Sequence, residues 1–428
     1  MDTITHGIAG ALLSKALFRG DDLLASRPMN RQRLVTWSTM FGAIFPDSDV
    51  FRDMLSRNDL LIITWHRSIT HSLLCLPFFA LILAALTRSV ARWRKWDAPS
   101  FSVLTGLYAA GILSHILLDL VTSFGTMAWS PLKWSRPAWD LIFIVDFTFT
   151  GLMLVPQILA WVQDHPEKAR RRAIASFAIF ALAIFVIQRI AEAVAAPISF
   201  ATVLFFILIL AAFFLLPLPT DKKIQREQRA ELAVQDLART NVRRRWNQFG
   251  FIGACTYLAL AVFAHHSALS RVKNFTVLQK LDVQSVGALP FPPSLWRWDG
   301  LVRTAGGVYE IRMDLSQKSP FEISAASDPA DKGHSASIQT ERPAIEYRFY
   351  PEANPNVYIE AAKELPQVQK VLWFDRFPVT RYHEEAGEPV VEFSDMRFPQ
   401  IRRGRTPSFT YRVRFGPGGN VLEQGWEK

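Results

Sequence analysis

The chain has 428 residues, of which 50% are hydrophobic and only 20% are charged, and its mean hydropathy is +0.13. This composition excludes a disordered chain and a collagen, because neither carries so large an apolar fraction. Only two cysteines, Cys75 and Cys255, are present, so disulfides do not hold the fold together. The net charge of +10 lies mostly in the apolar part, since residues 1–270 hold 27 Lys and Arg against 18 Asp and Glu. The charge alone is therefore no evidence for a nucleic-acid-binding protein.

Eight apolar segments in residues 1–270 predict an all-α bundle of membrane helices, two of them short. A helix that crosses a bilayer needs about 20 apolar residues, because the hydrocarbon is about 30 Å thick. Six segments reach this length, namely 68–88, 101–121, 141–162, 174–194, 198–218 and 249–268. Two shorter segments, 4–18 and 34–46, are expected to form short or half-buried helices that complete the bundle. No cleavable signal peptide is expected, because the first segment contains His6 and Lys15 and follows no basic region.

The distribution of Lys and Arg predicts how the helices are oriented, because these residues stay on the cytoplasmic side of short loops. With eight helices and the N-terminus outside, the inner loops hold 20 Lys and Arg and the outer loops hold 5. This difference predicts that the first residues and everything after residue 268 lie outside the cytoplasm. If only one of the two short segments crossed the membrane, the N-terminus would lie inside, but the later helices would keep their orientation.

The pattern changes after residue 270, where short runs alternate apolar and polar residues between turn residues, namely VYEIRMDL, IEYRFY, VLWFDRF, VVEFSDMRF and FTYRVRF. The sequence thus predicts a transmembrane domain of residues 1–270 and a small, β-rich, extracytoplasmic domain of residues 271–428. The polar and basic segment 222–245 is expected to be a solvated cytoplasmic helix. It lacks the interleaved aromatic residues of a nucleic-acid-binding segment, so no nucleic-acid partner is expected.

Ionisable residues from several distant segments fall at one predicted depth, the outer face of the bundle. Imidazole and charged groups inside a membrane segment are unfavourable, so they usually mark a functional site. The orientation was predicted from Lys and Arg alone, so the gathering of His and Asp on one face is independent evidence. The candidate metal ligands are His6, Asp47, Asp49, His66, His71, His115 and Asp119.

The residue types and their spacing favour a divalent metal site. His115 and Asp119 are four residues apart on a predicted helix, so they share one face. Asp47 and Asp49 follow a proline that ends a helix, so a loop can turn both carboxylates inward. Imidazole and carboxylate suit zinc, and carboxylates also suit manganese or magnesium. Seven candidates exceed one tetrahedral zinc site, so two ions, or one ion with outer partners, are both consistent with the sequence.

Two of these polar residues are also candidates for catalysis. Arg67, beside His66, suits an anionic group because a guanidinium pairs bidentately with phosphate or carboxylate. Arg67 and Asp49 are therefore the predicted catalytic residues. Asp140 and Asp146 are about equally well explained as charges at a helix N-terminus and as further ligands. A serine nucleophile fits less well, because no G-x-S-x-G motif is present.

Several short motifs resemble those of the YdjM-type inner-membrane proteins. The motifs are TH at 5–6, FPDSD at 45–49, HRSITHS at 66–72 and SHILLDLVTSFGT at 114–126, and SDMRF at 394–398 resembles the longer members. Members of this family are described as membrane-bound metal-dependent hydrolases, and in some cases as LexA-binding proteins. The family is linked by analogy to zinc-dependent phospholipase C. The resemblance implies a multi-pass protein of the bacterial inner membrane with a zinc-type His/Asp centre.

Three functional hypotheses follow. The first is an integral-membrane hydrolase whose one or two metal ions act on a lipid or lipid-linked phosphoester at the outer leaflet, with membrane lipid as its partner. The second is a non-catalytic binding or regulatory membrane protein with a structural metal, to which the LexA description belongs. The third is a transporter that uses the His and Asp residues as an ion path. Their gathering at one face, without matching polar residues at mid-bilayer, argues against the third.

Overall fold

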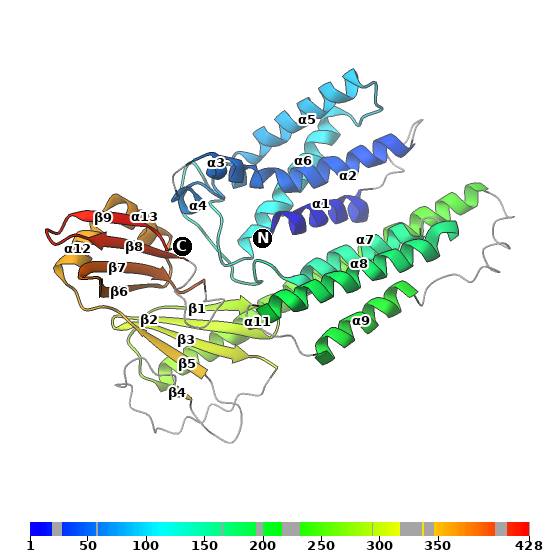
Figure 1. The fold of residues 1–428 in the computed structure, drawn as a ribbon. Helices are drawn as coiled ribbons and strands as arrows, with labels where there is room; N and C mark the ends of the chain where they lie inside the picture. The colour runs from blue at the N-terminus through cyan, green and yellow to red at the C-terminus, as the bar shows by residue number, and fades with distance from the viewer. Residues whose placement is uncertain are drawn as a thin grey trace.

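The structure is a computed structural model that describes residues 1–18, 28–56, 59–163, 166–193, 200–215, 232–292, 294–316, 336–337, 346–398 and 409–427. Helices make up the N-terminal part and two antiparallel sheets make up most of the C-terminal part (Figure 1). The predicted order, a helical bundle followed by a β-rich region, is confirmed at this level.

Helices α1 (Thr3–Leu17), α2 (Pro28–Ile44) and α6 (Phe101–Leu120) pack closely against one another. Glycines permit the close approach of their backbones. A Cβ atom on Gly10 would lie 2.6 Å from the Cβ of Ala43, and one on Gly111 would lie 2.3 Å from the carbonyl oxygen of Thr39. No larger residue fits these contacts without moving a helix. The backbone of α2 thereby comes within hydrogen-bonding reach of the side chains of α6.

Short elements join α2 to the next long helix. They are η2 (Phe45–Asp49), α3 (Val50–Leu55), α4 (Leu61–Thr64) and η3 (Ile69–His71), and they are followed by α5 (Leu76–Trp93). The helix expected to begin at residue 68 therefore begins at Leu76. The backbone before it is tied to another loop instead of to its own helix, because Met127 N–H donates to Arg67 O and Leu73 N–H donates to Ala128 O.

The other helices are α7 (Phe147–Gln163), α8 (Pro166–Ala193), α9 (Phe200–Leu215) and α11 (Leu232–Leu278), so each of the eight expected segments overlaps a helix. Within the described part of the chain, three helices are long and apolar enough to cross a membrane: Leu76–Trp93, Phe101–Leu120 and Val242–Leu278. Two further apolar helices are shorter, Phe147–Gln163 and Val203–Ala212.

Helix α11 is much longer than the segment expected at 249–268. It takes in the last part of the basic segment 222–245 and continues past residue 270, for a length of about 70 Å at about 1.5 Å per residue. Residues 222–231 of the expected polar helix lie outside the described residues.

The first sheet packs on the C-terminal end of α11. Its strands, in the order β1-β2-β3-β5-β4, are β1 (Val283–Phe291), β2 (Arg297–Thr304), β3 (Gly307–Asp314), β5 (Glu346–Pro351) and β4 (Ala336–Ser337). Val272 and Phe275 of α11 share a buried core with Trp298 and Ile311 of the sheet. Helix α11 and the first sheet thus share one hydrophobic core.

The second sheet packs on the loops at one end of the bundle. It consists of β6 (Pro378–Glu385), β7 (Glu388–Asp395), β8 (Thr410–Phe415) and β9 (Val421–Trp426), with helices α12 (Val357–Lys363) and α13 (Pro366–Phe374). Its buried core takes in Ile63 of α4 and Phe124, which follows α6, beside Phe374 and Val391. The second sheet therefore covers the loops that carry the candidate metal ligands.

Candidate metal centre

Helix α6 presents Gly111, His115 and Asp119 at successive four-residue steps along the face that meets α2. The side chains of His115 and Asp119 are completely buried. Nδ1 of His115 lies 2.6 Å from the carbonyl oxygen of Ala43, which can only accept a hydrogen bond. Nδ1 of the neutral ring therefore carries the proton, and Nε2 is left with an unshared electron pair.

Two 3-10 turns bring Asp47 and His71 to α6. Oδ1 of Asp47 lies 3.6 Å from His71 Nε2 and 3.5 Å from His115 Nε2. The hydroxyl of Thr70 donates to Asp49 Oδ2 over 3.2 Å, so it accepts from His71 Nδ1, which lies 3.0 Å away. The proton of the His71 ring is thus on Nδ1, and its Nε2 atom is also bare.

Four electron-pair donors converge at this point. His71 Nε2 and His115 Nε2 lie 3.0 Å apart, and Oδ2 of Asp119 lies 3.3 Å and 3.4 Å from them. With Asp47 Oδ1, these distances span 3.0–3.6 Å. A tetrahedral zinc ion with ligands at about 2.0–2.1 Å has ligand–ligand edges of about 3.3–3.4 Å. The four atoms therefore have the chemistry of a divalent cation site, and the five distances given above are close to its spacing.

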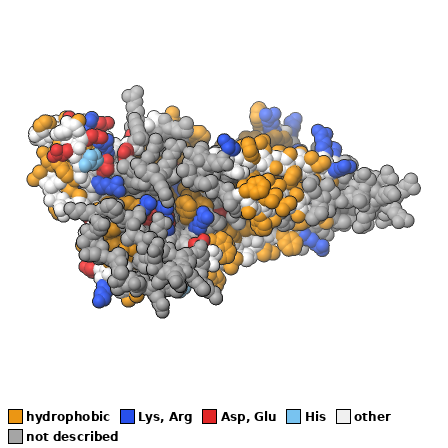
Figure 2. Space-filling model, turned by 60° about the horizontal axis from the view of Figure 1, so that its bottom comes forward, with side chains coloured by type: hydrophobic (Ala, Val, Ile, Leu, Met, Phe, Trp, Pro, Cys, Tyr) orange, Lys and Arg blue, Asp and Glu red, His pale blue; other side chains and the backbone are white. Residues whose placement is uncertain are grey.

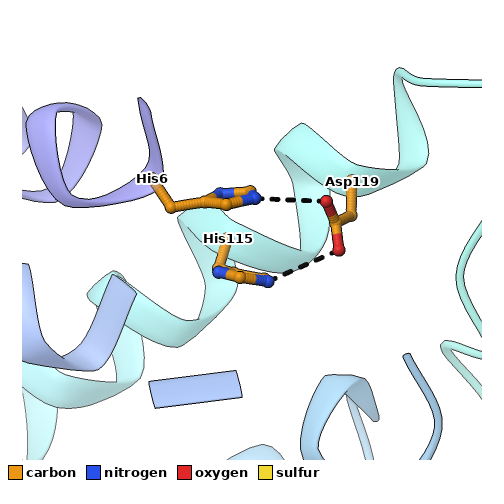
Figure 3. A group of neighbouring side chains, drawn as sticks. All are labelled: His6, His115 and Asp119. Atoms are coloured by element: carbon orange, nitrogen blue, oxygen red, sulfur yellow. Dashed lines mark hydrogen bonds and ion pairs between the residues drawn. The ribbon is translucent and has the colours of Figure 1, made fainter. Parts of the chain in front are cut away.

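The two carboxylate oxygens of Asp119 have different neighbours: one contacts supporting residues and the other faces the proposed ligands. Oδ1 lies 3.1 Å from both His6 Nε2 and Arg67 Nη2. Oδ2 is buried and has no hydrogen-bond partner among the described residues, and it is the oxygen that faces His71 and His115. Figure 3 shows one oxygen directed at His6 and the other at His115. A lone buried carboxylate oxygen would be unfavourable, so this geometry suits a bound cation.

His6 lies beside this group. Its ring stacks on His115 with centroids 3.6 Å apart and an interplanar angle of 19°. His6, His115 and Asp119 form one buried set of neighbouring ligand atoms, and Asp47, His71 and His115 form another. The two sets share His115, so the structure offers one compact centre and His6 at its edge.

Asp49 and His66 lie farther out. Oδ1 of Asp49 is 3.0 Å from His66 Nδ1, and Oδ2 accepts the backbone N–H of Arg67 at 2.9 Å and faces His71 Nδ1 at 3.4 Å. Burial alone would raise the pKa of Asp49, but the hydrogen bonds from His66 and from the backbone N–H of Arg67 hold it below its ordinary value. Asp49 thus remains a carboxylate that orients His71, as outer carboxylates orient metal-bound histidines.

The same side of the centre is where solvent reaches it. The side chains of Asp47, Asp49 and His66 are 9%, 12% and 16% exposed, whereas those of His6, His71, His115 and Asp119 are fully buried. The structure therefore brings all seven predicted ligand residues together, four of them around one point and three around its margin.

Arg67 lies between the centre and the loop after α6. Its φ of 61° is in the left-handed region, which is rare for a residue with a long side chain and marks a turn held in place by its surroundings. One guanidinium nitrogen pairs with Asp119 and another donates to the hydroxyl of Thr122 over 3.2 Å. Its Nε atom is buried without a partner among the described residues.

Arg136 was not predicted to belong to the site. Its Nη2 donates to the carbonyl oxygens of Ile63 and His66 over 3.0 Å and 2.6 Å. Burial, followed by the charges of Arg67 and Arg397, lowers the pKa of Arg136 to about 9, so the group stays charged at neutral pH but is poorly compensated. The only signal in the sequence was a basic residue in a predicted outer loop, where Lys and Arg are scarce.

Asp140 and Asp146 serve the architecture. Asp146 Oδ1 accepts the backbone N–H groups of Thr148 and Phe149 over 2.9 Å and 3.0 Å, so it caps the start of α7. Asp140 forms a bidentate pair with Arg376 over 2.8 Å and 3.0 Å. Asp146 is therefore a helix N-cap, one of the two roles expected for it. Asp140 instead joins the β-rich part to the bundle through Arg376.

The helices, their apolar surfaces and the buried His/Asp cluster define a membrane-associated protein with a candidate cation centre. Residues 1–195 match the family of YdjM inner membrane proteins, so the resemblance expected from the motifs is confirmed over this part of the chain. The match includes all seven candidate ligands. Comparison with curated proteins and with solved structures gave no match to the chain.

Proposed function

We propose that the protein is an integral-membrane, metal-dependent hydrolase that acts on a lipid or lipid-linked phosphoester at the outer leaflet. The observation that carries the proposal is the convergence of His71 Nε2, His115 Nε2, Asp119 Oδ2 and Asp47 Oδ1, with contacts of 3.0–3.6 Å. Such a set binds a divalent cation, of which zinc suits the mixture of imidazole and carboxylate best.

The residues divide into ligands and supports. His71, His115 and Asp119 are the proposed buried ligands, and Asp47, which is slightly exposed, completes the set. His6, Asp49 and His66 would hold these ligands in place by the hydrogen bonds and ring contacts described above. Both oxygens of Asp49 already contact His66, Arg67 and His71, so Asp49 is better suited to support a ligand than to bind the metal. Without Asp49 the ligand set is sufficient for one ion, and we therefore propose a single ion.

Hydrolysis needs a nucleophile and stabilisation of negative charge. A bound divalent ion would supply Lewis acidity and an activated water. Arg67 would steady an anionic group of the substrate beside the ligands, because one edge of its guanidinium is not used by Asp119 or Thr122. Asp49 and His66, on the exposed side, are placed to exchange protons with solvent.

The proposed depth of the site rests on two kinds of residue. The Lys and Arg distribution supports an outer position for the loops 47–67 and 122–140 and for the β-rich part. Trp129, Trp134 and Trp139 of the second loop are 49%, 43% and 48% exposed. Exposed tryptophans are typical of the headgroup region, so they support a substrate drawn from the membrane lipids. Figure 2 shows a broad hydrophobic surface on the helical part, as expected for contact with lipid tails.

A structural metal in a non-catalytic membrane protein is the second candidate. A set of four protein donors favours it, because structural zinc sites are closed whereas catalytic ones keep one position open. The two functions differ in whether Asp47 can give up its position to water or substrate.

The test uses the purified full-length protein in detergent. Zinc content is measured by elemental analysis, and hydrolysis is measured on phospholipid vesicles and on a soluble phosphodiester. Wild type is expected to carry about one zinc ion and to release product. His115→Ala and Asp119→Ala should lose both metal and activity, whereas His383→Ala, an exposed histidine in β6, should keep both. Equal and negligible metal in wild type and the two variants would refute the metal centre, and metal without hydrolysis would favour the structural alternative.

A further inference from the structure

A ladder of alternating guanidinium groups and phenyl rings runs from the metal centre into the second sheet. Its members, in spatial order, are Arg67, Phe124, Arg136, Phe374, Arg397 and Phe398. Each guanidinium carbon lies 4.5–5.3 Å from the centroid of the ring next to it. These distances are within the range of cation–π attraction. The ladder joins residues that are more than 300 positions apart in the chain.

The two ends of the ladder each have a carboxylate partner. Arg67 pairs with Asp119 in the metal centre, whose Oδ1 also accepts from the N-terminal ammonium of Met1. Arg397 pairs with Asp395 over 2.7 Å, and it also donates to the carbonyl oxygens of Phe374 and Ser123 over 2.7 Å and 3.2 Å. Both outer guanidinium groups therefore have a carboxylate partner, and one of them is tied to the loop that follows α6.

Arg136, in the middle, is not neutralised in this way. Among the described residues, no carboxylate lies within 4.0 Å of it, and its Nε and Nη1 atoms are buried without a partner. A buried charge without a counter-charge is unfavourable, so a plain structural role would be better served by an apolar residue. What Arg136 does that an apolar residue cannot is to hold two carbonyl groups, those of Ile63 and His66.

One of these carbonyls lies in α4 and the other lies in the turn that leads from α4 to the ligand His71. The turn contains His66, bonded to Asp49, and Arg67, whose backbone is in the left-handed region and whose N–H donates to the same carboxylate. The planar guanidinium of Arg136 donates to both Ile63 O and His66 O. It thereby sets the direction in which this turn leaves α4. The ring of Phe374 lies against the guanidinium of Arg136, and Arg397 lies over the same ring, so the second sheet and its helix α13 limit the position of Arg136.

We propose that Arg136 is a positioning residue of the metal centre, and that the second sheet is a working part of that centre through the Arg67–Phe124–Arg136–Phe374–Arg397–Phe398 ladder. The inference rests on the proposed metal centre. It predicts that metal affinity depends on residues of the β-rich part that touch none of the ligands.

The experiment measures zinc affinity by chelator competition, and the visible spectrum of the cobalt-substituted protein, with full-length protein in detergent. The cobalt spectrum reports the arrangement of the ligands and does not change when a remote contact merely lowers stability. The variants are Arg136→Gln, Arg136→Lys and Phe374→Leu. The control is Arg376→Gln, which breaks a tie between the bundle and the β-rich part that lies outside the ladder, the pair with Asp140.

Arg136→Gln is expected to weaken zinc binding by about 10–100-fold, as loss of outer supports does in other metal sites, and to shift the cobalt spectrum. Arg136→Lys should recover part of the affinity, because an ammonium keeps the charge but cannot span both carbonyls. Phe374→Leu should weaken binding less, with the same spectral shift. Arg376→Gln should lower the melting temperature and leave affinity and spectrum unchanged.

Other results would overturn the inference. If wild type binds zinc and both Arg136→Gln and Phe374→Leu bind it equally well with the same cobalt spectrum, Arg136 positions nothing. If Arg376→Gln lowers zinc affinity as much as Arg136→Gln does, zinc affinity depends on docking of the second sheet in general and not on the ladder. If Arg136→Gln does not fold, Phe374→Leu decides, since it keeps an apolar residue in the core. Failure of wild type itself to bind metal would instead refute the proposed function.

Discussion

Nε2 of His71 and Nε2 of His115 face each other at 3.0 Å, and each belongs to a ring whose proton is held on the opposite nitrogen. Two such unshared electron pairs repel each other unless a proton or a cation lies between them. The carbonyl of Ala43 and the hydroxyl of Thr70 set this arrangement from outside the pair. The centre is thus prepared by hydrogen bonds made on the far sides of its ligands.

Removal of metal should destabilise the protein. A ligand that binds only the folded state adds about 4 kcal/mol of stability at a thousandfold excess over its dissociation constant. Wild type with zinc is therefore expected to melt several degrees higher than after chelation, by differential scanning fluorimetry. Asp119→Asn should show no such difference, whereas His383→Ala should behave as wild type. An equal response of Asp119→Asn to zinc would place the binding site elsewhere.

Asp49→Asn separates a supporting carboxylate from a ligand. Its amide can still meet one neighbour but no longer accepts from His66, Thr70 and the backbone of Arg67 together. We expect zinc affinity to fall by about 10–100-fold without complete loss of binding. Asp119→Asn, measured by the same chelator competition, should lose binding altogether. Complete loss in both variants would show that Asp49 is itself a ligand.

Gly111→Ala tests the packing that supports His115. The new Cβ would meet the carbonyl oxygen of Thr39 at 2.3 Å, so α2 must move and the bond from His115 to Ala43 must lengthen. A loss of about 2–3 kcal/mol is expected, together with weaker zinc binding. Gly106→Ala on the same helix is the matched control. A Cβ there meets nothing within 4 Å, so the variant should be as stable as wild type or more stable by up to about 1 kcal/mol. Equal behaviour of the two variants would contradict the packing argument.

Asp146→Ala should be destabilising without an effect on metal. It removes the cap of α7 and the buried bonds from Tyr257 and Ser294, which are 2.7 Å and 2.5 Å long. The expected loss is about 2–3 kcal/mol, since a cap contributes about 1 kcal/mol and each buried bond about as much. Thermal melting and zinc content check the two parts. If Asp146→Ala lost zinc while keeping the stability of wild type, Asp146 would be a metal ligand and not a structural residue.

Asp299 of β2 gives the β-rich part a pH dependence of its own. Burial and the neighbouring charge of Glu310 raise the pKa of Asp299 to about 7, whereas an unfolded aspartate titrates near about 3.9. Between these values the folded state binds more protons, so stability falls as the pH rises from about 4 to about 7. Asp299→Asn should therefore gain about 1–2 kcal/mol at pH 8, a value reduced for partial hydration of the side chain, and nothing at about pH 4. An equal gain at both pH values would indicate better packing and not loss of a charge.

The sequence predicted the helices well because a bilayer-spanning helix needs only a long apolar run. It missed the start of α5, because Ser68 to Ser72 are bordered by apolar residues and yet their backbone pairs with the loop around Ala128. It also missed the extent of α11, since polar residues that continue a helix beyond the membrane carry no apolar signal. Alternation located strands β3, β5, β7 and β8, but it was wrong for the run VLWFDRF at 371–377, most of which lies in helix α13. A short apolar run does not distinguish a strand from a buried helix. The packing of the second sheet against Ile63 and Phe124 was not predictable either, because nothing local encodes a contact so far along the chain.

The candidate ligands were predictable because His and Asp are rare in apolar segments and the orientation placed them on one face. The sequence did not predict which candidates surround the central point and which lie at its margin. That division depends on the nitrogen of His71 that faces Asp49, which is known only from the structure. Arg136 was counted only as a basic loop residue. The sequence did not distinguish between a helix N-terminal charge and a ligand for Asp140. It gave no sign of the ion pair with Arg376, which lies 236 residues later. Long-range partners of this kind become visible only when the fold is known.

The contact between Arg397 and Ser123 spans 274 residues and has a consequence for biosynthesis. The candidate ligands have all been synthesised by residue 119, while Phe374, Arg397 and Phe398, which complete the ladder, follow only after α11. Since domains fold in the order in which they leave the ribosome, the bundle must wait with its metal-binding turn unsupported. Until Phe374 has been made, Arg136 lacks the ring that lies against it, so the turn before His71 is expected to be less firmly held in the nascent chain than in the complete protein.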